Sequence, residues 1–153
     1  MTRYWLMKSE PSCFSIEALA LRSQQTAPWD GVRNFQARNF MRDDMRLGDL
    51  AFFYHSSCTP PGIVGIMTIV REAYPDYTAW DPESDHPDPR STTDNPLWFM
   101  VDVCLKQRIQ PLLSLNQLKQ YPALSHMTVL KRGNRLSITP VSPEEWRFIE
   151  TLI

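Results

Sequence analysis

The sequence has 153 residues, 42% of them hydrophobic, and a formal net charge of −1 from 16 Lys and Arg against 17 Asp and Glu. The length suits one domain with its own core, so we expect residues 1–153 to form a single domain. A mean hydropathy of −0.35 with no long apolar run excludes a membrane-spanning protein. The balanced charge excludes binding of nucleic acid over a broad basic surface, so any such binding must be local.

The first half of the chain predicts short strands and two helices. Strands are expected at residues 4–8, 50–55 and 63–70. The last of these is apolar and rich in β-branched residues, which indicates burial on both faces. Ser15 is the predicted N-cap of a first helix, and Asn34, after a turn at 29–34, is that of a second helix from 35 to 45. The residues expected to face the core on these helices are Ile16, Leu19 and Ala20, then Phe35, Ala37, Phe40, Met41 and Met45.

The stretch from 75 to 96 holds five prolines and six acids against one base, Arg90. It predicts an ordered loop, anchored at its start by Tyr74, Tyr77 and Trp80. The residues outside this loop therefore carry more Lys and Arg than Asp and Glu, which gives them a modest net positive charge.

The second half ends in further short elements. They are a strand at 97–105, a helix capped by Ser114, a strand at 135–141, and a helix after Ser142 with Trp146, Ile149 and Ile153 on one face. Ser142-Pro143-Glu144-Glu145 forms a capping box with proline at the first helical position. Short strands and scattered helices without βαβ alternation predict an α+β fold, a small, mostly antiparallel β-barrel flanked by short helices.

Metal and redox chemistry have no sequence signature. Cys13, Cys58 and Cys104 are odd in number and lack CxxC spacing, and the three histidines match no metal-binding pattern. We therefore expect no metal and no cofactor. The first residues lack the apolar region of a signal peptide, so the expected location is cytoplasmic.

Arginines and one tryptophan are the candidate binding residues. Arg38, Arg42 and Arg46 are spaced as one stripe of the second helix, and Lys131-Arg132-Gly133-Asn134-Arg135 forms another basic cluster. Such groups are either solvated surface or contacts to phosphate. Trp29 lies in a Pro-Trp-Asp-Gly turn, where its ring can line a cleft and stack on a base.

Several motifs in order resemble the EVE domain family. The leading ones are Tyr4-Trp5-Leu6-Met7-Lys8-Ser9-Glu10-Pro11 and Trp29-Asp30-Gly31-Val32-Arg33-Asn34-Phe35-Gln36-Ala37-Arg38-Asn39. The likeness continues through Gly48-Asp49-Leu50, Phe53-Tyr54-His55-Ser56, Pro61-Gly62-Ile63-Val64-Gly65, Glu72-Ala73-Tyr74-Pro75-Asp76, Met100-Val101-Asp102-Val103 and Arg132-Gly133-Asn134-Arg135-Leu136-Ser137. It covers essentially the whole chain.

The resemblance implies a PUA-like small β-barrel flanked by helices, related to the YTH domains, and a non-enzymatic module that binds modified bases, notably 5-methylcytosine in DNA. It implies a pocket made of Lys8, Ser9, Glu10, Trp29, Val32, Arg33, Asn34, Tyr54, His55, Ser56, Arg132 and Arg135. In that pocket Trp29 would stack on a flipped or single-stranded base while Ser9, Glu10 or Asn34 bond its edge. Arg33, Arg38 and Arg132 would hold the flanking phosphates.

Three departures from the family pattern bear on ligand preference. Ser57 stands where the family has an asparagine whose amide could read a base edge, His86-Pro87 replaces a tyrosine pair, and Lys131 replaces an arginine. The alternatives are a reader of modified RNA, an enzyme acting on a small nucleobase-like or anionic ligand in the same pocket, and an adaptor whose pocket is vestigial.

Overall fold

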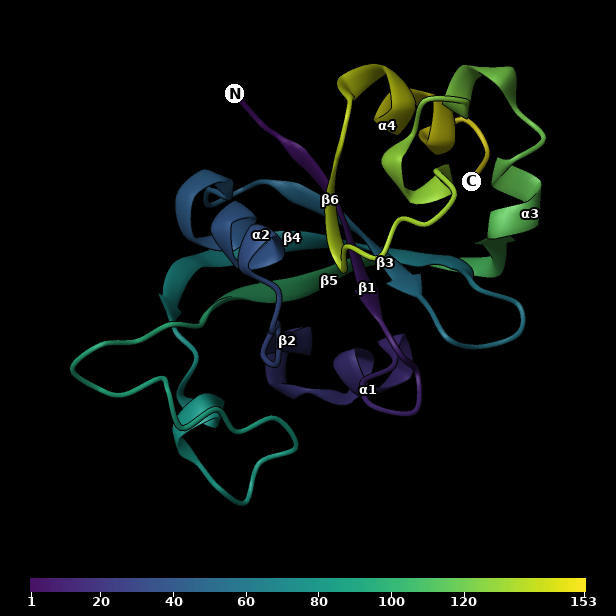
Figure 1. The fold of residues 1–153 in the computed structure, drawn as a ribbon. Coiled ribbons are helices and arrows are strands. Elements are labelled where there is room, and N and C mark those ends of the chain that lie inside the picture. The colour runs from purple at the N-terminus through teal and green to yellow at the C-terminus, as the bar shows by residue number, and fades with distance from the viewer.

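A computed structural model describes residues 1–153 and centres on one mixed sheet of six strands in the order β2-β5-β4-β3-β1-β6 (Figure 1). The strands are β1 Tyr4–Ser9, β2 Thr26–Pro28, β3 Leu50–His55, β4 Gly62–Pro75, β5 Phe99–Ser114 and β6 Ile138–Val141. Only β1 and β3 pair in parallel, and the four other neighbouring pairs are antiparallel. The expected α+β class and mostly antiparallel pairing are confirmed.

The expected closed barrel is wrong, because β2 and β6 are the two edges of the sheet and do not pair with each other. Apolar side chains alternate between the two faces of the strands, as the two-residue period of a strand dictates. Trp5, Met7 and Phe53 belong to a cluster of 19 buried residues, whereas Leu6 and Phe52 belong to a separate cluster of 13. Each face of the sheet packs against its own set of residues, so the sheet buries its apolar area without closing into a barrel.

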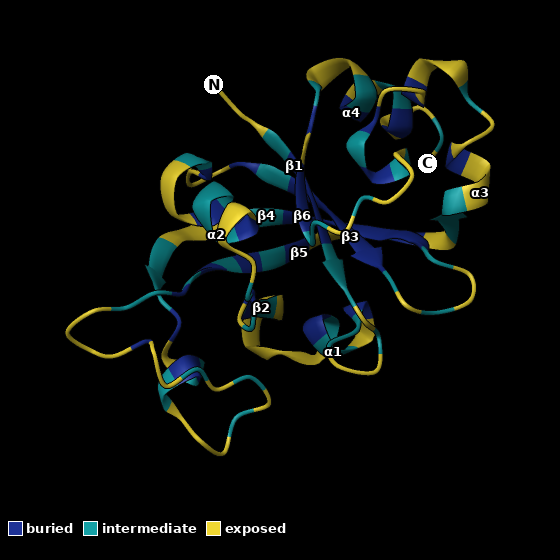
Figure 2. Ribbon diagram, viewed as in Figure 1, coloured by how far each residue is buried: buried dark blue, intermediate teal, exposed yellow.

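Short helices provide that cover (Figures 1 and 2). They are α1 Ile16–Leu21, α2 Phe35–Asn39, α3 Leu115–Leu118 and α4 Pro143–Glu150. Ile16 and Leu19 of α1 and Ala37 of α2 bury in the larger cluster, whereas Leu118 of α3 and Trp146 of α4 bury in the smaller one. The sheet therefore separates two hydrophobic cores.

All four predicted helix caps are confirmed. The side chains of Ser15, Asn34, Ser114 and Ser142 each accept a backbone N–H from the first turn of the helix, and the last two complete capping boxes. The second helix spans the expected residues, but after Asn39 it widens into a π-helix, Phe40–Asp44. Phe35 and Ile153, both expected in the core, are 48% and 42% exposed.

The boundaries of β4, β5 and β6 differ from the prediction. β4 and β5 pair from Gly62–Ser114 to Pro75–Phe99, so both extend beyond their apolar stretches. Backbone pairing needs no apolar side chain, so the hydrophobic pattern alone predicted both strands too short. In contrast, β6 begins only at Ile138, because the residues before it form a turn and an irregular segment.

The loop after β4 is ordered, but mainly through polar anchors. Its only helical piece is the 3-10 turn Tyr77–Trp80. Asp76 and Ser91 are buried, and the Asp88 carboxylate accepts Trp98 Nε1–H at 2.7 Å. Tyr77, an expected anchor, is 53% exposed, so that expectation is wrong. No helix of the protein combines the length and apolar character needed to cross a membrane.

Candidate functional site

A cavity of about 360 Å³ opens where the end of β1 meets the turn between β2 and α2. Its lining residues are Lys8, Ser9, Phe14, Pro28, Trp29, Asp30, Gly31, Val32, Arg33, Asn34, Arg135 and Ser137. It continues into a wider cleft of about 840 Å³, which adds Glu10, Arg22, Ser56 and His86 to the walls. Two stretches that the sequence singled out, 8–10 and 29–34, therefore meet at one place.

The apolar part of the cavity is made by Phe14, Trp29 and Val32. Trp29 is only 6% exposed, and its ring meets Phe53 edge-on at 5.2 Å and Phe14 at 6.2 Å between centroids. Most of the ring thus belongs to the core. Trp29 forms a wall of the cavity and does not stand free as an open stacking platform.

The polar part of the cavity combines a carboxylate with several donors. Burial raises the pKa of the Asp30 carboxyl, and neighbouring Asp76 adds to the effect while His86 opposes it. Burial lowers the pKa of the Lys8 ammonium, which lies 5.9 Å from the centroid of the Tyr54 ring. The Asn34 side-chain oxygen caps α2, which leaves its amide N–H groups for a ligand.

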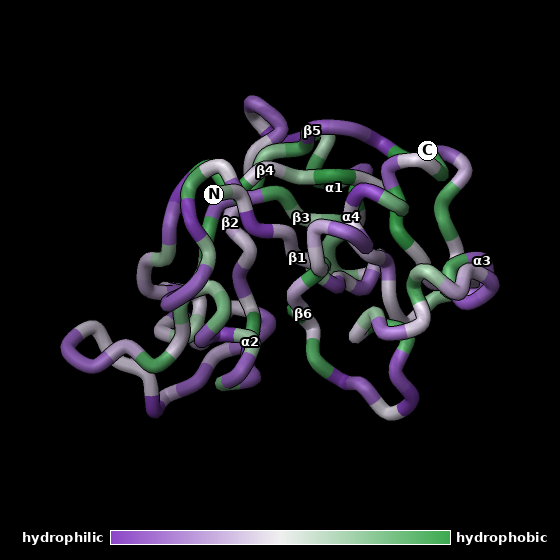
Figure 3. The backbone as a smooth tube through the Cα atoms, turned by 90° about the horizontal axis from the view of Figure 1, so that it is seen from above, coloured by the Kyte–Doolittle hydropathy of each residue, from purple (hydrophilic) through white to green (hydrophobic).

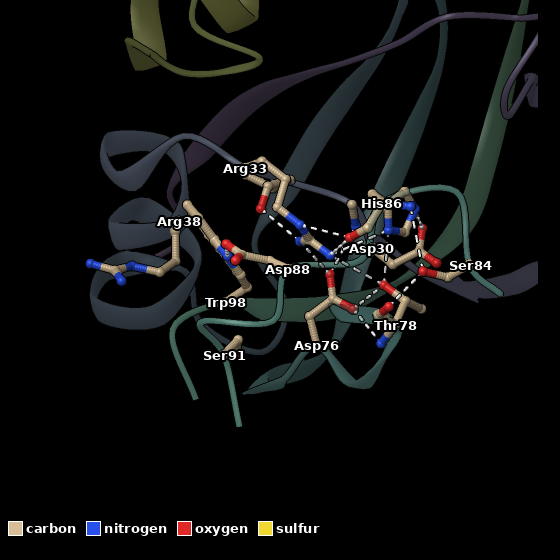
Figure 4. Close-up of polar contacts among 12 residues, drawn as sticks. Asp30, Arg33, Arg38, Asp76, Thr78, Ser84, His86, Asp88, Ser91 and Trp98 are labelled. Carbon is tan, nitrogen blue, oxygen red and sulfur yellow. Dashed lines mark hydrogen bonds and ion pairs between the residues drawn. The ribbon is translucent and has the colours of Figure 1, made fainter. Parts of the chain in front are cut away.

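Arg33 was expected to hold a phosphate, but its guanidinium is fully engaged inside the protein (Figure 4). It donates to Asp76 Oδ2 at 3.0 Å, to the Val32 carbonyl at 3.0 Å, and twice to the His86 carbonyl at 3.1 and 2.7 Å. The remaining N–H faces Thr78 Oγ1 at 3.4 Å and His86 Nδ1 at 3.3 Å. All five N–H groups of this arginine therefore have partners.

Asp76 is the centre of this clamp, with none of its surface exposed. Its carboxylate accepts the backbone N–H groups of Gly31 and Thr78, both at 2.9 Å, besides the Arg33 bond. Burial alone would raise the Asp76 pKa, but hydrogen bonds from Thr78, Gly31 and Arg33 outweigh it and hold the pKa below its ordinary value. The clamp fixes the loop after β4 against the turn that forms the cavity.

The expected basic stripe of the second helix does not form. Arg38 donates to the Leu97 carbonyl at 2.8 Å and to Asn39 Oδ1 at 2.7 Å, and it points away from the Arg33 clamp (Figure 4). Arg42 pairs with Asp43 at 2.8 Å, and Arg46 lies beyond the π-helix. The π turn breaks the four-residue spacing on which the stripe depended. None of the three lines the cavity or the adjoining cleft.

Tyr54, His55 and Ser56, the motif at the end of β3, do not all point into the cavity. Tyr54 is 3% exposed and lines a separate basin, and burial raises its pKa to about 12. Ser56 lines both the cleft and this basin. His55, expected in the pocket, points instead to α1, where its Nε2 accepts the Ile16 N–H at 3.2 Å.

His55 should therefore make stability depend on pH. Burial lowers its pKa, with Arg108 acting in the same direction and Glu17 against it. The neutral His55 ring contributes its full stabilisation of the fold above the unfolded-state pKa of about 6.5. This stabilisation is lost as pH falls below that value. Urea unfolding of the wild type should show falling stability from pH 7 to 5. His55→Gln should flatten this dependence, whereas His126→Gln, at an exposed histidine, should retain it.

Removing the ring altogether leaves the buried Ile16 N–H without a partner. His55→Ala should thus lower the free energy of unfolding by about 1–3 kcal/mol at pH 7. An unchanged pH slope in His55→Gln would contradict the assignment of His55 as a helix-start acceptor.

Arg132 and Arg135 stay available for binding. Both are exposed on the irregular segment before β6. Arg135 lines the cavity and the cleft, and Arg132 lines the basin that also holds Tyr54. No group of three or more His, Cys, Asp or Glu side chains is placed to hold a metal ion.

The cavity residues that the sequence did not predict are Phe14, Pro28, Asp30, Gly31 and Ser137. Asp30 and Ser137 stand inside quoted motifs, so position within a motif was the available signal. Phe14 lies between the motif that ends at Pro11 and the Ser15 N-cap, and no pattern marked it. It reaches the cavity because Ser9 Oγ–H donates to its carbonyl at 2.7 Å and folds the segment back on β1.

Comparison with known proteins finds relatives over almost the whole chain. The profile of the EVE domain matches residues 3–152. Mouse thymocyte nuclear protein 1 is 47% identical over 169 aligned residues, covering 99% of this chain and 74% of that protein. A Pseudomonas putida protein of known crystal structure is 54% identical, with a TM-score of 0.92 over 97% of this chain and 98% of the other.

One similar structure contains a ligand. The crystal structure of human THYN1 protein in complex with DNA containing 5-methylcytosine is 46% identical, with a TM-score of 0.92 over 99% of this chain and 97% of that one. A YTH domain of Zygosaccharomyces rouxii, at 13% identity and a TM-score of 0.54, shares the fold alone. The expected structural relation to YTH domains is thereby confirmed.

Proposed function

Because this chain belongs to the EVE domain family, we propose that residues 1–153 act as one non-enzymatic domain that binds a modified base of nucleic acid. The base we favour is 5-methylcytosine in DNA. One observation carries the proposal: a cavity with apolar, acceptor and donor walls lies in the chain's own family motifs, and a structure that is 46% identical was crystallised with 5-methylcytosine DNA.

The walls of the cavity suit the chemistry of 5-methylcytosine. Its methyl group can lie against Phe14, Trp29 and Val32. The Asp30 carboxylate can accept the exocyclic amine, in the way that acidic side chains read cytosine. Donors remain for the ring nitrogen and carbonyl oxygen, and these are Lys8, Asn34 and Arg135.

A cavity of this kind takes a base that has left the stack. The base must be flipped or single-stranded, because its edges are covered inside a duplex. We propose binding without reaction because the similar structure that contains DNA is a complex with that DNA. Ser9 commits its hydroxyl proton to the Phe14 carbonyl.

A cytoplasmic location is in keeping with three free cysteines.

The test is an affinity panel at one stated salt concentration, with cytosine and 5-methylcytosine in single- and double-stranded DNA and RNA. Burial of one methyl group is worth about 0.8 kcal/mol, so we expect about fourfold tighter binding of the methylated single DNA strand. Equal affinity for methylated and plain strands in every context would overturn the proposal. A preference for modified RNA would replace DNA as the partner, and a new product detected by mass analysis would identify an enzyme.

A further inference from the structure

A second basin, of about 570 Å³, adjoins the cavity and differs from it in charge. Its cationic side chains are Lys8, Lys119, Lys131 and Arg132, and none of its 13 lining residues is acidic. Lys8 lines both the basin and the cavity, so the two hollows share a wall. A ligand can thus extend from one into the other.

The cations of the basin are free to bind. Lys119, Lys131 and Arg132 are exposed, and Lys119 contributes only its backbone to the end of α3. Elsewhere arginines are paired with acids, as in the half-buried Arg33–Asp76 pair at 3.0 Å and the exposed Arg108–Glu17 pair at 3.0 Å. The basin therefore concentrates unpaired positive charge on a chain whose total charge is close to zero.

A tight turn holds two of these cations in place. The Asn134 N–H donates to the Lys131 carbonyl at 3.2 Å, and Gly133 has a φ of +79°, which favours glycine. Lys131 begins this turn and Arg132 lies at its tip. Figure 3 shows the turn as a hydrophilic projection beside β6, on the opposite side of the view from the acidic loop.

The cleft is balanced in charge, and the acidic excess lies beyond it. Glu10, Asp30 and Asp85 line the cleft together with Lys8, Arg22 and Arg135. The loop after β4, residues 76–95, adds more acid, with six acidic residues against one base. A phosphate backbone is attracted to the basin and repelled by this loop, so the charges give a bound strand one preferred path.

We propose that the basin binds the phosphodiester backbone next to the base in the cavity. The strand then runs over α3 and the Lys131–Asn134 turn, and it avoids the acidic loop. Lys119 becomes a phosphate contact that the sequence did not indicate, and it lies in the same basin as Lys131 and Arg132 of the basic cluster. This inference rests on the proposed function, since it places the strand whose base the cavity holds.

The experiment measures how the affinity for a single-stranded 5-methylcytosine oligonucleotide depends on salt. The double variant Lys119→Ala/Lys131→Ala should bind more weakly at low salt. Its slope of log affinity against log salt should be smaller by about 0.7 for each phosphate that the variant no longer neutralises. The matched control is Lys106→Ala/Arg147→Ala, which removes the same charge from exposed residues outside the cavity, cleft and basin.

The preference for the methylated base distinguishes a failure of the basin assignment from a failure of the proposed function. The ratio of affinities for methylated and plain strands should stay unchanged in Lys119→Ala/Lys131→Ala, because phosphate contacts carry no sequence information. If the wild type prefers the methylated strand but both double variants show equal slopes, the basin assignment is wrong and the proposed function stands. If the wild type binds no nucleic acid, both fall.

Discussion

Replacing Arg33 by alanine should lower the free energy of unfolding by about 3–5 kcal/mol, the usual effect of breaking a buried ion pair from one side. Asp76 has no exposed surface, and Arg33 is its only cationic partner. Without Arg33, a buried carboxylate keeps its charge with two backbone N–H groups and Thr78 as its remaining partners. Urea unfolding at pH 7 measures the decrease.

A second substitution separates the ion pair from the change in packing. Arg33→Ala/Asp76→Asn removes both charges and should be more stable than Arg33→Ala alone. Arg135→Ala is the matched control among the arginines of the cavity. Its side chain is exposed, so stability should change by less than about 0.5 kcal/mol while nucleic-acid affinity falls. Equal stability of Arg33→Ala and Arg135→Ala would contradict the clamp.

Trp29→Ala should have the other large effect, because it acts on both the core and the cavity. Truncation of a buried tryptophan costs about 3–5 kcal/mol. Since Trp29 also supplies part of the apolar wall, discrimination between 5-methylcytosine and cytosine should disappear in the fraction that remains folded. Affinities measured at low temperature, with folding checked by circular dichroism, test this.

Trp146→Ala provides the control for stability. Trp146 is 1% exposed and stacks on Phe52, with 3.9 Å between ring centroids, in the core on the other face of the sheet. Its truncation should destabilise the protein comparably but leave base discrimination intact. If both variants retain the preference for the methylated base, Trp29 is only a core residue and the methyl group lies elsewhere.

Local features of the fold could be predicted from sequence, because they depend on neighbours in the chain. Ser15, Asn34, Ser114 and Ser142 cap helices through bonds to backbone three residues away, and each was expected. Barrel closure depends on whether the edges β2 and β6 pair, which no local pattern reports. The strands and their mostly antiparallel pairing were therefore predicted correctly, whereas the closed barrel was not.

The candidate site shows the same division. Lys8, Trp29 and Asn34 belong to recognisable motifs and line one cavity, although their binding to a base stays a prediction. Arg33 and His55 belong to the same motifs but serve the fold, through partners 43 and 39 positions away. Sequence alone shows that these residues stand together in motifs, but it cannot show which of their donors remain free.

The position of the 5-methyl group shows directly whether the cavity is the base pocket. In a complex with a single-stranded 5-methylcytosine oligonucleotide, intermolecular nuclear Overhauser effects from the base methyl protons should reach side-chain protons of Phe14, Trp29 and Val32, the apolar wall of the cavity. Contacts confined to Leu115, Val129 and Leu130 would instead place the methyl group in the basic basin. That result would contradict the assignment of the cavity as the base pocket.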